Sequence, residues 1–367
     1  MIPLFSPYIP PEAGDAVKQV IESGWINTGP KEKQFRERLQ EKFGFPYCVA
    51  TNNCTASLRA SLAAIGVTRG YEVITTPWTM IATNTVILEQ GATPVFADIE
   101  YDTLNIDPED VARKITDKTK AIMCVHYAGA PCNLDELMTI AKSHNIALIE
   151  DAAQALGAKY NGHHIGSTGE LVNFSFQAIK TITSGDGGAI ATNSEELYEK
   201  LQALVWFGID KKLRMKTPLG TLPHDVEVLG FKYNMNDITA TLGLVGLNHF
   251  DDALQKRRAV ARRYREELQS LNDITLMNYP NNVESAYWMF PIHVKRRLQF
   301  AEYMRRNGVE VSVHYPRNDG YTIFGGKQPL PATERVDADT IHIPIHSNLS
   351  EAQVAKVIDT VRRWHGY

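Results

Sequence analysis

Short apolar runs alternate with amphipathic stretches over the first two thirds of this 367-residue chain. The runs are short and apolar without alternation, as expected for strands that are covered on both faces. They span residues 47–51, 72–76, 94–98, 121–126, 147–150, 172–176 and 188–191. Helix-length stretches lie between several of them, at 55–65, 80–89 and 134–144. This rhythm predicts a layered α/β domain with a largely parallel sheet of about seven strands.

The rest of the chain has a different pattern. Asn161-Gly162 between short flanking segments predicts a small hairpin over 158–165, and the polar stretch 211–225 predicts a long loop. A long helix is expected at 251–270, then a βαβ-like set at 287–294, 298–306 and 309–314, and a last helix at 351–364. We therefore expect a large domain over 1–250 and a smaller C-terminal α/β domain over 251–367.

Composition and charge exclude several classes of protein. Apolar residues make up 44% of the chain and charged residues 22%, which is ordinary for a soluble globular protein. Lysine and arginine total 38 against 42 acidic residues, a net charge of −4, so no basic footprint indicates a nucleic-acid partner. No apolar run approaches the length of a membrane span, and the N-terminal residues lack the features of a signal peptide. We expect a cytoplasmic protein.

The four cysteines, Cys48, Cys54, Cys124 and Cys132, form no CxxC pair and no cysteine/histidine cluster along the sequence. Three of them lie in or beside apolar runs. These positions predict buried, reduced thiols and no metal site.

Candidate chemistry is concentrated between residues 147 and 192. A buried strand ends in Glu150-Asp151, at the kind of position where α/β folds bind their ligands. Lys180 follows the next predicted sheet strand, and a glycine-rich turn at 185–188 leads into the one after it. Desolvation lowers the pKa of a lysine, and the resulting neutral amine can form a Schiff base with an aldehyde.

An amine and a carboxylate at two strand ends are the polar anchors that pyridoxal phosphate (PLP) requires. A phosphate could bind at 52–57, where the chain leaves a strand and opens a helix, and Ser175 could add a hydroxyl. Each feature has a simpler explanation, since Asp151 could cap a helix and Lys180 could be a surface lysine. These residues are also compatible with other Rossmann-like proteins that bind phosphate, although the sequence contains neither of their motifs, GxGxxG or GxxxxGK[ST].

Five ordered motifs carry a resemblance to a known family. They are Gly24-Trp25 with Thr28-Gly29-Pro30, the stretch GATPVFAD at 91–98, EDAAQ at 150–154, FSFQAIK at 174–180 with GDGG at 185–188, and GFKYNMND at 230–237. The chain resembles the DegT/DnrJ/EryC1/StrS family of PLP-dependent nucleotide-sugar aminotransferases over nearly its whole length. The resemblance implies the fold type I architecture of aspartate aminotransferase and a homodimer with its active sites at the subunit interface.

The resemblance also implies roles for individual residues. Lys180 would carry the Schiff base and shuttle the proton, Asp151 would pair with the pyridinium nitrogen, and Gln154 would bond the 3-hydroxyl. Thr55, Ala56 and Ser175 would bind the phosphate, with Cys54 beside them in the cofactor site. Lys232 or Asn234 would reach the phosphate in the neighbouring subunit. The residues that would face the substrate are Trp25, Thr28, Gln177, His314 and Tyr315.

Three positions depart from the family pattern, and one of them is Gln177, which stands where histidine or tyrosine is common. Asn53-Cys54-Thr55 stands where Ser-Gly-Thr is usual, so this turn must accommodate the side chain of Cys54. Met80 occupies the position of an aromatic residue that covers the cofactor ring, and Trp78 is the alternative for that task.

The implied activity is transfer of an amino group from an amino acid, with L-glutamate expected, to a nucleotide-linked keto-sugar. The cofactor would cycle between PLP and pyridoxamine phosphate, and the amino sugar would serve a surface polysaccharide or a related glycan. Two other functions stay open. One is a sugar dehydratase or epimerase of the same fold, and the other is a non-catalytic PLP-binding regulatory protein.

Overall fold

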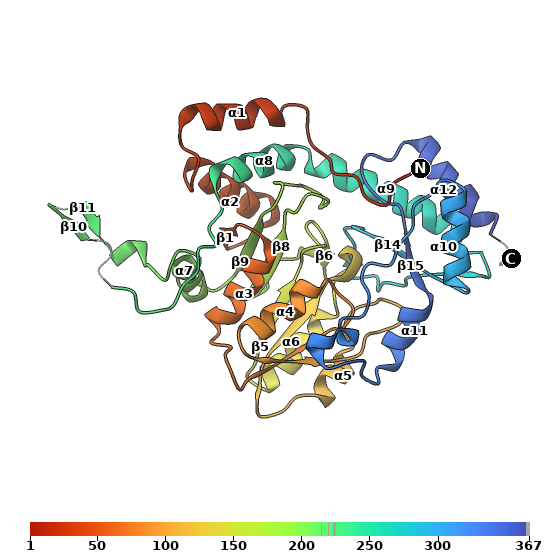
Figure 1. Ribbon diagram of the computed structural model, residues 1–367, viewed down its shortest axis with the longest axis horizontal. Helices are drawn as coiled ribbons and strands as arrows, with labels where there is room; N and C mark the ends of the chain where they lie inside the picture. Colours follow the sequence, from red (N-terminus) through yellow and green to blue (C-terminus); the bar gives the residue numbers. More distant parts are fainter. Residues whose placement is uncertain (214, 219, 223–224, 365–367) are drawn as a thin grey trace.

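A computed structural model describes residues 1–213, 215–218, 220–222 and 225–364. Its centre is a seven-stranded sheet in the order β1-β9-β8-β5-β4-β2-β3 (Figure 1). Strand β9 is antiparallel to β1 and β8, and the other neighbours are parallel. The strands are β1 (Tyr47–Thr51), β2 (Glu72–Thr75), β3 (Thr93–Phe96), β4 (Thr119–Val125), β5 (Ala147–Asp151), β8 (Leu171–Ser175) and β9 (Gly188–Thr192). The mostly parallel seven-stranded sheet predicted from the sequence is confirmed.

Helices cover both faces of this sheet. Neighbouring residues of a strand belong to different cores, as Ile122 and Met123 of β4 show, because strand side chains alternate between the faces. The core of one face contains residues of α2 (Pro30–Phe43), α6 (Leu134–Ser143) and α8 (Asp237–Asn248). The core of the other contains residues of α3 (Cys54–Ala64), α4 (Ile81–Glu89) and α7 (Glu195–Leu204). Helix α1 (Ala13–Ser23) packs on α8, and α5 (Pro108–Arg113) on α6.

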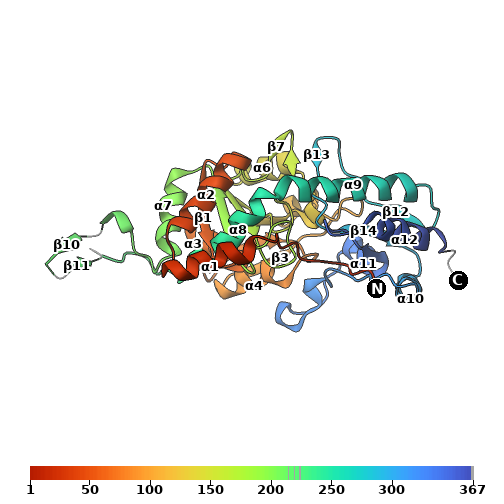
Figure 2. The same cartoon turned by 90° about the horizontal axis from the view of Figure 1, so that it is seen from above.

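The C-terminal third forms a separate hydrophobic core around a small antiparallel sheet of order β12-β14-β15. Its strands are β12 (Ile274–Leu276), β14 (Phe290–Val294) and β15 (Thr340–Ile343). Its helices are α9 (Phe250–Leu268), α10 (Arg297–Arg306), α11 (Pro331–Asp339) and α12 (Glu351–Arg362). Ile2 also belongs to this core, so the first residues of the chain run beside the C-terminal third (Figure 2). The domain boundary at residue 250 stays a prediction.

The predicted βαβ-like set is only partly correct. Residues 309–314 form isolated bridges, Val309 with Ile2 and Ser312 with His342, instead of a strand. The strand that pairs with β14 is instead β15, which directly follows α11 in the chain. The sequence pattern does not predict this strand. Two short 3₁₀ turns, Asn318–Gly320 and Thr322–Phe324, lie between α10 and α11, and another, Tyr127–Gly129, follows β4 of the central sheet.

Two hairpins extend from the layered body. The predicted one consists of β6 (Lys159–Tyr160) and β7 (His163–His164), and β13 (Val283–Glu284) pairs with β6. The loop predicted at 211–225 contains a short turn, Lys211–Leu213, and a hairpin of β10 (Met215–Thr217) and β11 (Gly220–Leu222), which projects from the body (Figure 1). Residues 214, 219, 223 and 224 of that prediction lie outside the described residues. Within the described ranges, no helix has the length and apolar character needed to cross a membrane.

Candidate active site

A cavity of about 730 Å³ lies at the carboxyl edge of the central sheet, a volume typical of small-molecule sites. Strands β5 and β8 end at it with Asp151 and Ser175, and helices α3 and α4 begin beside it. Most of the residues predicted from the sequence line this one cavity. They are Cys54, Thr55, Ala56, Met80, Asp151, Gln154, Ser175, Gln177, Lys180, His314 and Tyr315.

Asp151 is buried and held by two hydrogen bonds. Its Oδ2 accepts from the Thr83 hydroxyl at 2.7 Å, and its Oδ1 accepts from the Ala153 N–H at 3.1 Å. Burial raises the pKa of Asp151, whereas these two bonds and the nearby Lys180 act to lower it. The carboxylate is therefore fixed in orientation, and donors from two sides offset part of the effect of its burial.

Lys180 lies in the loop between β8 and β9. Two backbone bonds close this loop, from Phe176 N–H to the Gly187 carbonyl and from Ser184 N–H to the Phe176 carbonyl, both at 2.8 Å. Burial lowers the pKa of Lys180 to about 8, although Cys54 and Asp151 act in the opposite direction. At neutral pH a minor fraction of the amine is unprotonated, and this neutral form is the one that can act as a nucleophile or base.

The start of α3 has the form of an anion site. Asn53 caps the helix, because its Oδ1 accepts from the Ala56 N–H at 2.7 Å. Gly188 of β9 packs so closely here that a Cβ would lie 2.7 Å from the Asn53 carbonyl. The turn accommodates Cys54, whose partly buried side chain lines the cavity. Burial raises the pKa of this thiol well above its usual value.

The side-chain amide of Gln154 is oriented so that its nitrogen can donate a hydrogen bond to a ligand. Its Oε1 accepts from the backbone N–H of Ala128 at 2.7 Å, and the side chain is 4% exposed. With the oxygen engaged, the NH₂ group is the part of the amide left to donate into the cavity.

Five predicted residues lie outside the cavity lining. Trp78 is fully buried in a cluster with Tyr127, whereas Met80 lines the cavity. Of the two candidates for covering the cofactor ring, Met80 is therefore the one that can reach it. The other four form one hydrogen-bonded group. Lys232 donates to Asn234 Oδ1 at 2.6 Å, Asn234 donates to the Thr28 hydroxyl at 2.5 Å, and Trp25 donates to the Thr28 carbonyl at 3.3 Å.

Several residues of the site are not predicted from the sequence. Thr83 bonds Asp151 directly, and Arg59 lines the cavity, where it contacts the Tyr233 hydroxyl and Glu89, both at 3.2 Å. Trp288 lies behind Lys180, with its ring centroid 3.7 Å from the amine. The sequence marks Thr83 only by its place in the stretch around Met80, and it contains no signal for Trp288.

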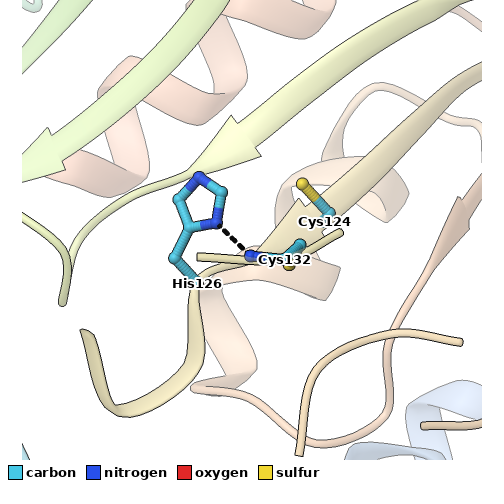
Figure 3. Close-up of side chains that lie close together, drawn as sticks. All are labelled: Cys124, His126 and Cys132. Carbon is cyan, nitrogen blue, oxygen red and sulfur yellow. Dashed lines mark hydrogen bonds between the residues drawn. The ribbon is translucent and has the colours of Figure 1, made fainter. Parts of the chain in front are cut away.

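The expectation that cysteine and histidine do not cluster is wrong. Cys124, His126 and Cys132 bring their ligand atoms within 4.8 Å of one another, because the chain turns back after β4 (Figure 3). His126 Nδ1 accepts from the Cys132 N–H at 3.1 Å, its Nε2 contacts Glu150 at 2.9 Å, and the Cys132 thiol donates to the Val125 carbonyl. These bonds already use both ring nitrogens, so the cluster acts as a packed support behind the Glu150-Asp151 strand end.

The class of the protein follows from two features: the strand order with its single antiparallel strand, and the lysine and carboxylate at the sheet edge. Together they define a fold type I transferase. The model of the DegT/DnrJ/EryC1/StrS aminotransferase family matches residues 7–362. The chain belongs to this family.

Individual relatives agree with this assignment. The chain is 33% identical to the spore coat polysaccharide biosynthesis protein SpsC of Bacillus subtilis, an alignment that covers 98% of this chain and 96% of SpsC. It is 35% identical to the uncharacterized protein MJ1066 of Methanocaldococcus jannaschii, over 99% and 97% of the two chains.

Solved structures show the same fold. The sugar aminotransferase CalS13 from Micromonospora echinospora superposes with a TM-score of 0.93 at 31% identity, over 99% of this chain and 100% of that chain. Spr1654 from Streptococcus pneumoniae, in its PMP form, superposes with a TM-score of 0.90 at 30% identity, over 98% of both chains, and it has also been solved in a PLP form. The family, the fold and the enzyme class expected from the sequence are confirmed.

Proposed function

We propose that the protein uses PLP to transfer an amino group from an amino acid, L-glutamate in the first instance, to a nucleotide-linked keto-sugar. The observation that carries this proposal is that Lys180 and Asp151, from two different strand ends, line one cavity of suitable size. The similarity to SpsC supports a product that serves a surface polysaccharide or a related glycan.

The donors around the cavity fit this cofactor. The N–H groups at the start of α3, with Thr55, Ala56 and Ser175, suit its phosphate. Asp151 suits the ring nitrogen, the amide NH₂ of Gln154 suits the 3-hydroxyl, and Met80 supplies a thioether for the ring face. When bound, PLP supplies an electron sink for the carbon that loses or gains the amino group.

The protein's own groups then have separate tasks. Lys180, with its pKa lowered to about 8, accepts and returns a proton at Nζ. Asp151 keeps a proton on the ring nitrogen, and each unit of pKa shift that it imposes there corresponds to about 1.4 kcal/mol. His314 and Tyr315 close one side of the cavity, where the Tyr127 hydroxyl donates to the His314 carbonyl. We assign these two residues, with Gln177, to the sugar.

A homodimer is part of this proposal. Trp25 is 59% exposed although it is large and aromatic, and it lies in the hydrogen-bonded group with Thr28, Lys232 and Asn234. None of the four lines the cavity of its own chain. We assign this group to the second subunit's phosphate and substrate site.

The test is a pair of half-reactions. Protein loaded with PLP should lose its visible absorption band when glutamate is added, with one 2-oxoglutarate formed per site. Protein loaded with pyridoxamine phosphate should regain the band with one member of a panel of nucleotide keto-sugars. Conversion of a sugar without consumption of any amino donor would instead support a dehydratase or epimerase, and PLP binding without either half-reaction would support a regulatory protein.

A further inference from the structure

The amine of Lys180 rests against an aromatic ring. Its Nζ lies 3.7 Å from the centroid of Trp288, and among the described residues the structure gives this nitrogen no hydrogen bond or ion pair. A desolvated ammonium is attracted to the face of an indole, because the ring quadrupole places negative charge there. A neutral amine gains less from the same position.

Trp288 is itself held firmly. It is 1% exposed, its Nε1 donates to the carbonyl of Ile179 at 3.1 Å, and its backbone N–H donates to the Ala128 carbonyl at 2.9 Å. Phe5 stacks on the indole with centroids 5.3 Å apart. The ring is thus tied to the residue that directly precedes Lys180, so it cannot move independently of that loop.

Trp288 does not line the cavity. It follows α9 in the chain and lies behind the lysine, so an amine in contact with it stays at the cavity wall, beside the ligand space, without entering bulk water. An amine that alternates between a bond to the cofactor and a free state needs such a position.

We propose that Trp288 is a positioning residue that holds the free amine of Lys180 beside the cavity whenever that amine is not joined to the cofactor. This inference rests on the proposed function, because only there does the lysine alternate between the two states.

The charged and titratable groups around the amine set the size of the effect. Cys54 from α3 and Asp151 from β5 favour the ammonium, whereas Arg257 from α9 opposes it, and His314 lies close enough to be influenced by Lys180. Arg257 is also buried, and its Nη1 donates to the Trp288 carbonyl at 3.2 Å. Because Trp288 adds attraction for the ammonium, its removal should favour the neutral amine.

The experiment measures Lys180 in the protein without cofactor. Competitive acylation across a pH series, with mass spectrometry of the peptide that contains Lys180, gives the apparent pKa of this amine. In Trp288→Leu, which keeps an apolar side chain, we expect that pKa to fall by about one unit. Trp364→Leu is the matched control, since Trp364 is a nearly buried tryptophan of the C-terminal core and should leave the pKa unchanged.

A second measurement does not depend on how the leucine variant folds. Replacing all five tryptophans with a multiply fluorinated analogue weakens the ring quadrupole and nearly preserves the shape, so the same fall in pKa is expected. An unchanged Lys180 pKa in the folded fluorinated protein, or in folded Trp288→Leu, overturns the inference. Neither measurement requires PLP. If the protein binds no PLP, the proposed function is wrong, but the effect of Trp288 on the pKa of Lys180 can still be measured.

Discussion

The hydroxyl of Thr83 donates a 2.7 Å hydrogen bond to Oδ2 of Asp151, and both side chains are buried. Helix α4 thereby supports a carboxylate at the end of β5. Burial alone would favour the protonated acid, so this bond helps to keep the charge that the proposed pairing with a ring nitrogen requires.

Removing that hydroxyl should weaken cofactor binding. A hydrogen bond to a charged group contributes about 1.5–3 kcal/mol, so Thr83→Val should raise the dissociation constant for PLP at least about tenfold. Titration of the cofactor-free protein with PLP measures this. Thr85→Val is the control on the same helix, because the Thr85 hydroxyl donates to the Ala82 carbonyl of its own helix and not to Asp151. Equal affinities for the two variants would show that Thr83 does not act through Asp151.

Asp151→Asn tests the carboxylate itself. An amide cannot hold a proton on the ring nitrogen by charge, so we expect the half-reaction with glutamate to slow by about 10²-fold or more while PLP still binds. Rapid-mixing absorbance on the loaded protein gives the rate. A variant that binds PLP and reacts at the wild-type rate would remove Asp151 from the mechanism.

Gly188 controls the start of α3. A Cβ at this position would lie 2.6 Å from the Thr51 hydroxyl oxygen and 2.7 Å from the backbone of Asn53. Gly188→Ala should therefore lower the free energy of unfolding by about 1–3 kcal/mol and weaken PLP binding, because the phosphate end of the site must shift. Gly14→Ala is the control, since Gly14 lies in α1 and a Cβ there would come within 4 Å of nothing beyond its own stretch of helix. Denaturant unfolding of both variants decides the matter, and equal stabilities would contradict the packing argument.

His342 should make the protein sensitive to acid. It is fully buried between the Tyr127 hydroxyl and the Ser312 carbonyl, and burial lowers its pKa from 6.5 to about 3. Between these two values the unfolded chain binds a proton that the folded protein does not. Stability is therefore lost as the pH falls through this window, by about 1.4 kcal/mol per unit for this one group.

Thermal unfolding between pH 7 and pH 4 measures the effect. His342→Asn should be less stable at pH 7 and should lose less stability on acidification than the wild type. The control is His163→Asn at an exposed position, which should leave the dependence of stability on pH unchanged. A His342 variant with the wild-type slope would exclude this histidine as the source.

Some features follow from the sequence because they depend on local pattern. Continuous apolar runs mark all seven strands of the central sheet, and the residues at the strand ends put Asp151 and Lys180 at the same edge. The hairpin at 215–222 is not predicted from the sequence, because Pro218 and Gly220 indicate a break. In the structure Gly220 begins β11 and has a φ of 110°, so the same residue allows the chain to turn back.

Other features depend on contacts between distant segments. Trp288 and Lys180 are far apart in sequence, and nothing local marks the indole as a partner of the amine. The Cys124, His126 and Cys132 cluster likewise arises because the chain reverses after β4. Trp78 and Met80 are neighbours in sequence, and only packing shows that Met80 faces the cavity while Trp78 is buried.

The central claim is that Lys180 is the residue that binds the cofactor covalently. Protein loaded with PLP should be reduced with borohydride, digested, and examined by mass spectrometry for the peptide that carries the reduced cofactor. We predict one label per chain, on Lys180, and none after Lys180→Ala. A label on another lysine, or a PLP-treated protein that acquires none, would contradict the account.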